Sequence, residues 1–252
     1  MPKWDANQYL KFEKQRTQPA IDLAMRIINH KPKTIVDIGC GPGNSTCVLK
    51  DLFSDSDILG IDSSANMIKK AQSEYPLIKF QVCDAQFLKG KYDLIFSNAC
   101  LQWIPNHHDL IPKLMQNLNS KGLLAVQMPM NASEPLFQII DEVADDPKWG
   151  FYNSTPDINK TLTPDEYLQI LTDCCSSFEV WQTKYYHLLP DHKSLVEWVK
   201  GTRIRPYLER LDSNQCIEFE NEIIQRAKQI YPVLKNGNVV LGFRRFFFTA
   251  VK

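Results

Sequence analysis

The sequence predicts an α/β fold in which a mainly parallel sheet is covered by helices on both faces. Three observations predict it. Apolar, β-branched runs alternate with stretches of helical length through the first half of the chain. These runs are nearly continuous in apolar residues, which is typical of strands buried on both faces. The first run leads directly into glycines at positions 39, 41 and 43, and this spacing is typical of a turn that a ligand approaches closely.

The bulk composition is that of an ordinary globular protein. The chain has 252 residues, of which 44% are hydrophobic and 23% charged, enough for one α/β domain with additions. Lys+Arg and Asp+Glu both number 29, so the net charge is zero, and nothing indicates a nucleic-acid or membrane partner. The polar N-terminal segment and the absence of an apolar run of about 18 residues lead us to expect a cytoplasmic protein. Seven cysteines without CxxC spacing favour reduced thiols, and we expect a monomer.

The strands are recognised by their apolar, β-branched composition. The first five are expected at 34–39, 57–62, 78–85, 92–98 and 122–129. Two more, at 178–189 and 244–251, flank a mainly helical stretch, so they could pair as an antiparallel edge of the sheet.

The helices are recognised by their apolar spacing and by their N-terminal signals. The first is expected at about 18–29, with Pro19 in its first turn. Others are expected at 44–53, 63–75, after Pro105, around 135–144, at 163–174 and through 191–231.

Polar side chains end several of the predicted strands. Asp62 ends the second strand, 23 residues after Gly39, where a carboxylate can accept both ribose hydroxyls of an adenosine ligand. Asp84 ends the third strand and can accept from an exocyclic amine, and Asn98 ends the fourth. Because the carboxyl ends of parallel strands meet at one edge, the sequence predicts an adenosine site there.

The glycine turn distinguishes between adenosine ligands. Its pattern is DxGxGxG, with Asp37 just before the first glycine, whereas a dinucleotide turn is normally GxGxxG. A carboxylate at this position would repel pyrophosphate and would suit a ligand whose tail carries an ammonium group. S-adenosylmethionine has that ammonium, a sulfonium and free ribose hydroxyls, so we favour it over NAD and over a purely structural turn.

The segments DIGCGPGNS, GIDSS, DLIFSNACLQW and LLAVQMP resemble the class I S-adenosylmethionine-dependent methyltransferases. The resemblance implies a seven-stranded Rossmann-like methyltransferase sheet with its last strand antiparallel, and a helical cap. WDANQYLKFEKQRTQPA, WQTKYYH, GTRIRPYL and FRRFFF resemble a narrower family, the trans-aconitate methyltransferases. The implied reaction esterifies a carboxylate of a small polycarboxylic acid, trans-aconitate in the first place, and releases S-adenosylhomocysteine.

We predict three regions in the chain. Residues 1–30 form a lid segment, 31–130 form the cofactor-binding core, and 131–252 supply the remaining strands with substrate-binding cap insertions. The aromatic residues Trp4, Tyr9 and Phe12 could close over the cofactor or anchor the N-terminus.

The residues expected at the cofactor lie in the glycine turn, at strand ends and just after the fourth strand. They are Asp37, Gly39, Cys40, Gly41, Asn44, Asp62, Ser63, Met67, Asp84, Ala85, Asn98, Gln102 and Trp103. We expect no metal ion, because the adjacent histidines at 107 and 108 lack a ligand set of suitable spacing.

The substrate is expected to meet arginine. A carboxylate is ionised at neutral pH and needs no general base, so alignment and removal of water should supply the catalysis. Arginine has the best geometry for a carboxylate, and the candidates are Arg16, Arg203, Arg205, Arg244 and Arg245.

Five of the residues outside the cofactor half are predicted at the substrate. Neighbours on a strand point to opposite faces, so at most one of residues 244 and 245 should reach the site. The predicted set is Arg16, Arg205, Arg245, Tyr186 and His187.

Three alternatives remain open from the sequence. The acceptor could be a malonyl thioester on a carrier protein, which would need a basic docking patch at the mouth of the site. The protein could instead be an S-adenosylmethionine-binding regulator without turnover. A dehydrogenase is the third and weakest interpretation.

Overall fold

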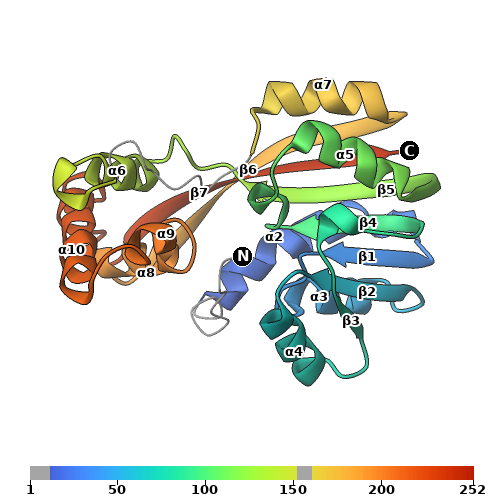
Figure 1. Cartoon of the computed structure of the whole chain (residues 1–252), viewed down its shortest axis with the longest axis horizontal. Coiled ribbons are helices and arrows are strands. Elements are labelled where there is room, and N and C mark those ends of the chain that lie inside the picture. The colour runs from blue at the N-terminus through green and yellow to red at the C-terminus, as the bar shows by residue number, and fades with distance from the viewer. Residues whose placement is uncertain (1–11, 152–160) are drawn as a thin grey trace.

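A seven-stranded sheet organises the chain, in the order β3-β2-β1-β4-β5-β7-β6 (Figure 1). The computed structural model describes residues 12–151 and 161–252. The strands are β1 Thr34–Ile38, β2 Asp57–Asp62, β3 Lys79–Val82, β4 Tyr92–Asn98, β5 Leu118–Pro129, β6 Ser177–Leu189 and β7 Val239–Val251. β1 to β5 are parallel, and β7 lies antiparallel to both β5 and β6. The expected fold class, with its last strand antiparallel, is confirmed.

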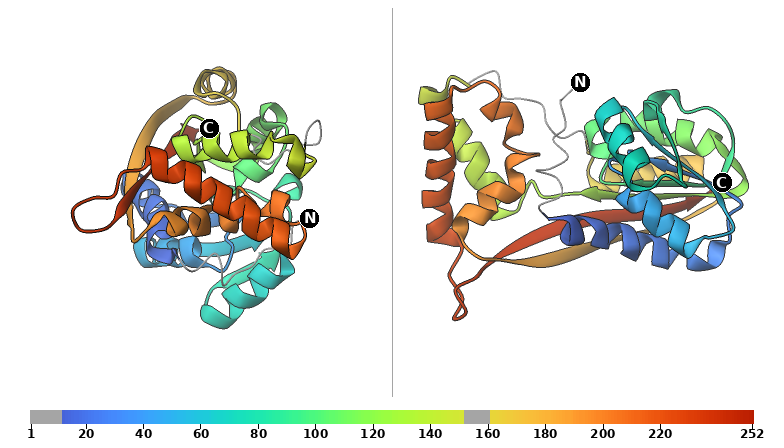
Figure 2. Two further views of the ribbon diagram at one scale, coloured as in Figure 1. Left: turned by 90° about the vertical axis from the view of Figure 1, so that its left-hand side faces the viewer. Right: turned by 90° about the horizontal axis from the view of Figure 1, so that it is seen from below.

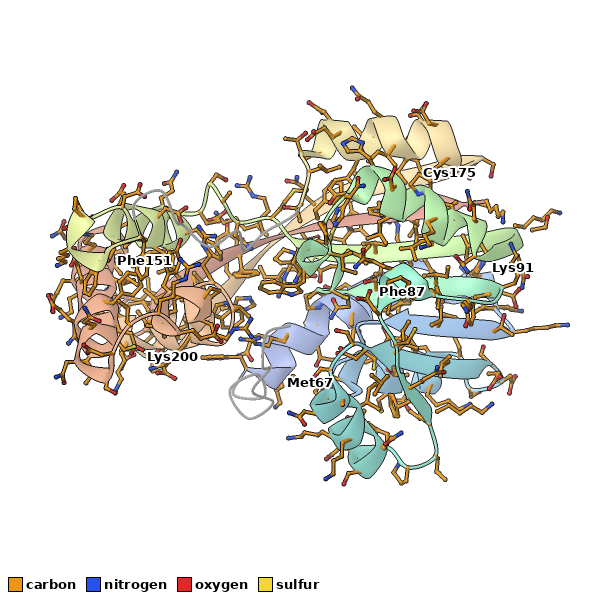
Figure 3. All side chains as sticks on the ribbon, in the orientation of Figure 1. Met67, Phe87, Lys91, Phe151, Cys175 and Lys200 are labelled. Atoms are coloured by element: carbon orange, nitrogen blue, oxygen red, sulfur yellow. The ribbon has the colours of Figure 1, made fainter. Side chains whose placement is uncertain are left out.

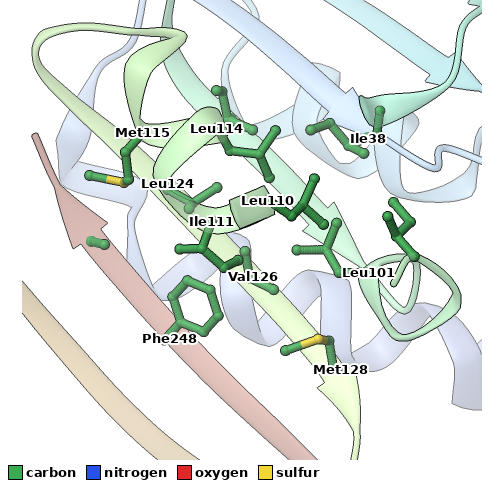
Figure 4. Close-up of a cluster of buried hydrophobic side chains, with 14 of the residues drawn as sticks. Ile38, Leu101, Leu110, Ile111, Leu114, Met115, Leu124, Val126, Met128 and Phe248 are labelled. Atoms are coloured by element: carbon green, nitrogen blue, oxygen red, sulfur yellow. The ribbon is translucent and has the colours of Figure 1, made fainter. Parts of the chain in front are cut away.

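Helices cover both faces of the sheet. They are α2 Glu13–Arg26, α3 Asn44–Leu52, α4 Ala65–Glu74, α5 His107–Gln116, α6 Pro135–Ala144, α7 Pro164–Cys174, α8 His192–Lys200, α9 Arg205–Leu208 and α10 Ser213–Ile230. α2 and α3 pack on one face, and α5 and α7 pack on the other (Figure 1). On the second face, Leu110, Ile111 and Leu114 of α5 meet Val126 of β5 and Phe248 of β7 (Figure 4).

The cap is a separate lobe at one end of the sheet. β6 and β7 pair over thirteen positions, from Ser177↔Val251 to Leu189↔Val239, and extend beyond the other strands into the cap (Figures 1 and 2). There α6, α8, α9 and α10 bury a second apolar core around the strand ends. Phe151 lies among the side chains of the cap, whereas Met67 and Phe87 lie in the other lobe, which holds the parallel strands (Figure 3). The cap is thus built within 131–252, where substrate-binding insertions are predicted.

Several expected boundaries are wrong. β7 begins at 239 rather than 244 because its pairing with β6 continues into the cap. The helical stretch 191–231 is three helices, because a turn follows α8 and Asp212 caps α10 through a capping box with Gln215. Pro19 lies inside α2 rather than in its first turn, since that helix begins at Glu13.

In the cofactor half of the chain, β3 ends at Val82 rather than at 85, and β5 begins at Leu118 rather than at 122. β2 and β4 have the expected bounds, and Ser64 caps α4 by accepting from the backbone N–H of Met67. None of the described helices combines the length and apolar character needed to cross a membrane.

Candidate active site

The three glycines of the turn after β1 have different surroundings. A Cβ on Gly39 would lie 2.2 Å from the Sγ of Cys100, and one on Gly43 would lie 2.7 Å from the ring of Tyr75. A Cβ on Gly41 would meet no described heavy atom within 4 Å, although its φ of +55° also disfavours a side chain. Gly39 and Gly43 therefore allow close packing, and Gly41 borders open space.

Asp37 is fully buried beneath this turn. Ser45 Oγ and Thr46 Oγ1 each donate to its Oδ2 at 2.6 Å. Burial is the main cause that raises the pKa of Asp37 to about 6, and the two hydroxyl donors oppose it. Its Oδ1 has no hydrogen-bond partner among the described residues, and a buried orphan oxygen is uncommon. One carboxylate oxygen thus remains for a donor or a cation.

Asp62 is fixed beside the same turn by two backbone donors. The N–H of Gly41 donates to its Oδ2 at 3.0 Å and the N–H of Ser64 donates to its Oδ1 at 2.8 Å. Burial raises its pKa, and these two bonds oppose that rise. Each oxygen keeps a further lone pair, so the carboxylate can still accept from hydroxyl groups.

The other predicted cofactor residues near the strand ends differ in exposure. Asp84 is partly buried and accepts from the N–H of Gln86 at 2.9 Å. Met67 and Ala85 are buried, whereas Ser63 is exposed.

A small cavity of about 30 Å³ lies over the glycine turn. It brings together the turn, the start of α3, one turn of α2 and the end of β4. The lining residues are Arg16, Thr17, Gly39, Cys40, Gly41, Pro42, Asn44, Ser45 and Asn98.

A larger cavity of about 170 Å³ lies between the core and the cap. Its polar lining residues are Arg16, Gln102, Asn131, Thr202, Arg203 and Arg245. Its apolar lining residues are Ala99, Trp103, Pro129, Ala132, Phe137, Trp198 and Phe243. An apolar cavity of about 150 Å³ accepts benzene, so this volume is on the scale of a small molecule. Arg16 belongs to both linings, so the two cavities adjoin at its side chain.

Two of the arginines in the larger cavity are buried and held by contacts with other groups of the protein. Arg16 is 8% exposed, and its Nη2 donates to the backbone oxygen of Trp198 at 3.2 Å. Arg245 is 5% exposed, and its guanidinium carbon lies 4.6 Å from the ring centre of Phe243. Its Nη1 donates to Gln127 Oε1 at 3.5 Å. Such packing fixes both guanidinium groups before any substrate arrives.

Some of the residues predicted at the substrate line the larger cavity, and others do not. Arg16 and Arg245 line the larger cavity, whereas Arg205 and Tyr186 are absent from the linings of both cavities. Arg205 faces Glu209 at 3.6 Å, and Tyr186 is 68% exposed on β6. His187 is buried behind the cavity wall.

The environment of His187 keeps it neutral. Its ring stacks on Trp198 at 4.4 Å between centroids. Burial first, and then the charge of Arg245, lower its pKa to about 4. His187 therefore supports the position of Trp198 rather than lining the cavity.

The alternation of neighbouring arginines on β7 follows the expected pattern. Arg245 lines the cavity, while Arg244 forms an ion pair with buried Glu134 at 3.2 Å.

Gln102 and Trp103 line the larger cavity rather than the small one. Asn131, Trp198 and Phe243 were not predicted at the site. No local sequence signal marks them, because they come from three separate elements that the cap brings together. Among the described residues, no cluster of three His, Cys, Asp or Glu side chains could hold a metal ion.

The N-terminal prediction falls partly outside the described residues. Trp4 and Tyr9 are not among them. Phe12 packs on Trp198 of the cap, with 4.8 Å between ring centroids.

Comparison with known proteins decides the family. Residues 29–192 match a family model described as a methyltransferase domain. A trans-aconitate 2-methyltransferase of Methylobacterium nodulans is 39% identical over 254 residues, covering 99% of this chain and 98% of that protein. Enzymes of the same name from Rhodopseudomonas palustris and Escherichia coli O139:H28 are each 37% identical, covering 100% and 99% of this chain and 100% and 98% of those proteins. This chain belongs to the trans-aconitate 2-methyltransferase family. The resemblance seen in the sequence is confirmed, and with it the expectation of a methyltransferase.

Solved structures agree on the fold of this family member. The YcgJ protein of Bacillus subtilis superposes with a TM-score of 0.61 at 14% identity, covering 93% of this chain and 98% of that one. The plantazolicin methyltransferase BpumL, solved in complex with SAH, superposes with a TM-score of 0.53 at 14% identity, covering 98% and 90%. At such identities the likeness concerns the fold alone.

Proposed function

We propose that this protein transfers a methyl group from S-adenosylmethionine to a carboxylate of trans-aconitate. The single observation that carries the proposal is the arginine-lined cavity that adjoins the cavity over the glycine turn at Arg16. Relatives that match along the whole chain are named for this substrate.

The residues at the glycine turn fit S-adenosylmethionine. Asp37 keeps an oxygen without a partner for an ammonium group, and Gly41 leaves room beside the backbone. Asp62 has lone pairs for the ribose hydroxyls, and Asp84 and Ala85 would flank the adenine. When bound, S-adenosylmethionine would supply a methyl group on its cationic sulfur. A substrate carboxylate would take this methyl carbon as its C–S bond breaks, which gives the ester and S-adenosylhomocysteine.

The residues of the larger cavity would bind and orient the acid. Removing water from several carboxylates is costly unless cations replace it, and Arg16, Arg203 and Arg245 supply three positive charges. Trp103 and Trp198 exclude water from the same space. The reacting carboxylate is already ionised, so no residue of the cavity has to remove a proton from it. The contribution of the cavity residues is alignment.

The cap supports a small free acid as the acceptor. Trp198 and Thr202 of the cap line the cavity, and its volume of about 170 Å³ favours a small free acid over a carrier-bound thioester. We also propose that the protein acts in the cytoplasm as a monomer. The seven cysteines are free in the structure, in keeping with a reducing compartment.

A turnover assay tests this function. Purified protein is incubated with labelled S-adenosylmethionine and trans-aconitate, citrate, malonate or malonyl carrier protein, and the methyl ester is quantified. We expect trans-aconitate to give the highest kcat/KM. Binding of S-adenosylhomocysteine without ester formation from any acceptor would instead support a regulator, and preferential methylation of the carrier protein would support that alternative.

A further inference from the structure

The third arginine of the larger cavity reaches it from the cap. Arg16 comes from α2 and Arg245 from β7, whereas Arg203 lies in the turn between α8 and α9. Arg16 also lines the cavity over the glycine turn, and Arg203 is absent from that lining. Because α8 and α9 are helices of the cap, Arg203 belongs to the cap side of the larger cavity.

Two side chains of α6 hold the guanidinium of Arg203. Asp141 Oδ1 accepts from its Nη2, and the ring centre of Phe137 lies 6.0 Å from its central carbon. Phe137 and Asp141 are four residues apart on α6, so they present one face. The Arg203 side chain is 19% exposed. This arrangement fixes the direction of the guanidinium before a substrate binds.

Arg203 keeps donors for a second carboxylate. A guanidinium has five N–H donors, and Asp141 Oδ1 accepts a hydrogen bond from the Nη2 of Arg203. The Nε of Arg203 is buried and has no hydrogen-bond partner among the described residues. Asp141 is itself 46% exposed, so solvent screens its charge and it neutralises Arg203 incompletely.

We propose that Arg203, oriented by Asp141 and Phe137, determines specificity by binding a substrate carboxylate other than the one that is methylated. This proposal rests on the proposed function. Arg16 also lines the cavity over the glycine turn, where the reacting carboxylate must meet the methyl donor. In a substrate with a further carboxylate at the cap side, that carboxylate accepts hydrogen bonds from the remaining donors of Arg203. An acid without that carboxylate leaves this buried donor without its partner, and sites of this kind reject such analogues strongly.

The test removes the carboxylate and the arginine separately and together. Mesaconate and trans-glutaconate each lack one of the three carboxylates of trans-aconitate. We would measure kcat and KM for the three acids through formation of S-adenosylhomocysteine. The proteins are the wild type, Arg203→Gln, Arg203→Lys and Asp141→Asn. The control is Arg210→Gln, an exposed arginine that lies close by in the cap.

The expected result is a loss confined to one carboxylate. Arg203→Gln raises KM for trans-aconitate on the order of 10- to 100-fold, because a charged hydrogen-bonding pair is lost. Its KM for the dicarboxylate that already lacks that group stays within about twofold of the wild type. Arg203→Lys keeps the charge without the planar fork and recovers part of the loss. Asp141→Asn shows a smaller loss in the same direction, and Arg210→Gln shows none.

Two results would overturn the proposal, and they are distinguishable. An equal change in KM for all three acids, or no change, would show that Arg203 does not bind one particular carboxylate of the substrate. In that case the proposed function would stand as long as the wild type methylates trans-aconitate. Failure of the wild type to methylate any of the acids would overturn both. Binding of S-adenosylhomocysteine by each variant verifies that it is folded, and Asp141→Asn tests the idea even if Arg203→Gln does not fold.

Discussion

At the scale of the residue, the environment of Asp37 disfavours its negative charge. It is fully buried, and two hydroxyl donors serve one of its oxygens while the other has no partner among the described residues. Burial raises its pKa to about 6. A bound ammonium would supply the missing partner, so the cost in stability and the affinity for cofactor have one physical origin.

The first prediction concerns stability of the variant Asp37→Asn. A native pKa of about 6 against the usual 3.8 means that the folded state holds a proton which the unfolded state has released. The free energy of unfolding therefore falls as the pH rises through this window, by about 3 kcal/mol for this group. Asp37→Asn removes that dependence, so its stability relative to wild type should improve between pH 4 and pH 7. Urea unfolding at several pH values measures this, and parallel curves for the two proteins would contradict it.

The second prediction concerns cofactor affinity. An ammonium beside Asp37 favours the ionised carboxylate, so wild-type affinity for S-adenosylhomocysteine should rise about tenfold between pH 5 and pH 7. Asp37→Asn should bind more weakly and without this pH dependence. Calorimetry of S-adenosylhomocysteine binding provides the measurement. An unchanged affinity in the variant would remove Asp37 from the cofactor site.

The glycine turn gives a third prediction, because its positions meet different surroundings. Gly41→Ala adds a methyl group where the protein leaves space, so it should cost about 1 kcal/mol of stability through its backbone conformation. The same methyl should weaken S-adenosylhomocysteine binding on the order of tenfold or more. Gly39→Ala would instead meet Cys100, and we expect a loss above about 3 kcal/mol. Thermal unfolding and calorimetry separate the two effects, and similar behaviour of both variants would contradict this explanation.

At the scale of the element, the sequence was informative where a site is built from consecutive segments. Asp62 and Asn98 end parallel strands, and Asp84 follows the end of β3 by two residues. Such strand ends necessarily meet at one edge of the sheet. Nothing comparable indicated that Arg203 lies in the larger cavity and that Arg205 does not, because a turn after α8 decides which side chain faces it. The position of Tyr186 could not be predicted for a related reason. β6 is an edge strand, and only its pairing with β7 determines which of its faces is exposed.

Helix α2 links the two lobes and carries Arg16, which leads to the fourth prediction. Its buried residues pack on the core sheet, Arg16 donates to Trp198 of the cap, and Asp22 accepts from the hydroxyl of Tyr185 on β6. Tyr185→Phe removes that last bond, so it should cost about 1 kcal/mol of stability. It should also raise KM for the acid several-fold by loosening the helix that positions Arg16.

The control for this element is Arg26→Gln. Arg26 pairs with Glu179 at 2.8 Å, but both side chains are more than half exposed, and such pairs contribute little. We expect KM to stay unchanged in this variant. Equal effects of Tyr185→Phe and Arg26→Gln on KM would show that α2 does not transmit its position to the site.

At the scale of the whole molecule, charge is balanced overall and concentrated locally. The chain carries 29 basic and 29 acidic residues, so it has no net charge to steer an anion over long distances. Three arginines nevertheless line one cavity between core and cap. Recognition of a multiply charged acid therefore depends on short-range fields inside that cavity.

This balance leads to the fifth prediction, which compares the two ligands. Salt at 0.1 M screens charges beyond about 10 Å, and entry of a trianion into the cavity is sensitive to it. We expect KM for trans-aconitate to rise about three- to tenfold between 0.05 M and 0.5 M potassium chloride. S-adenosylhomocysteine has no net charge, so its Kd should change less than twofold over that range. Steady-state kinetics and calorimetry in the same buffers measure both quantities. If the two ligands respond equally, the salt acts on the fold as a whole rather than on the arginine-lined cavity.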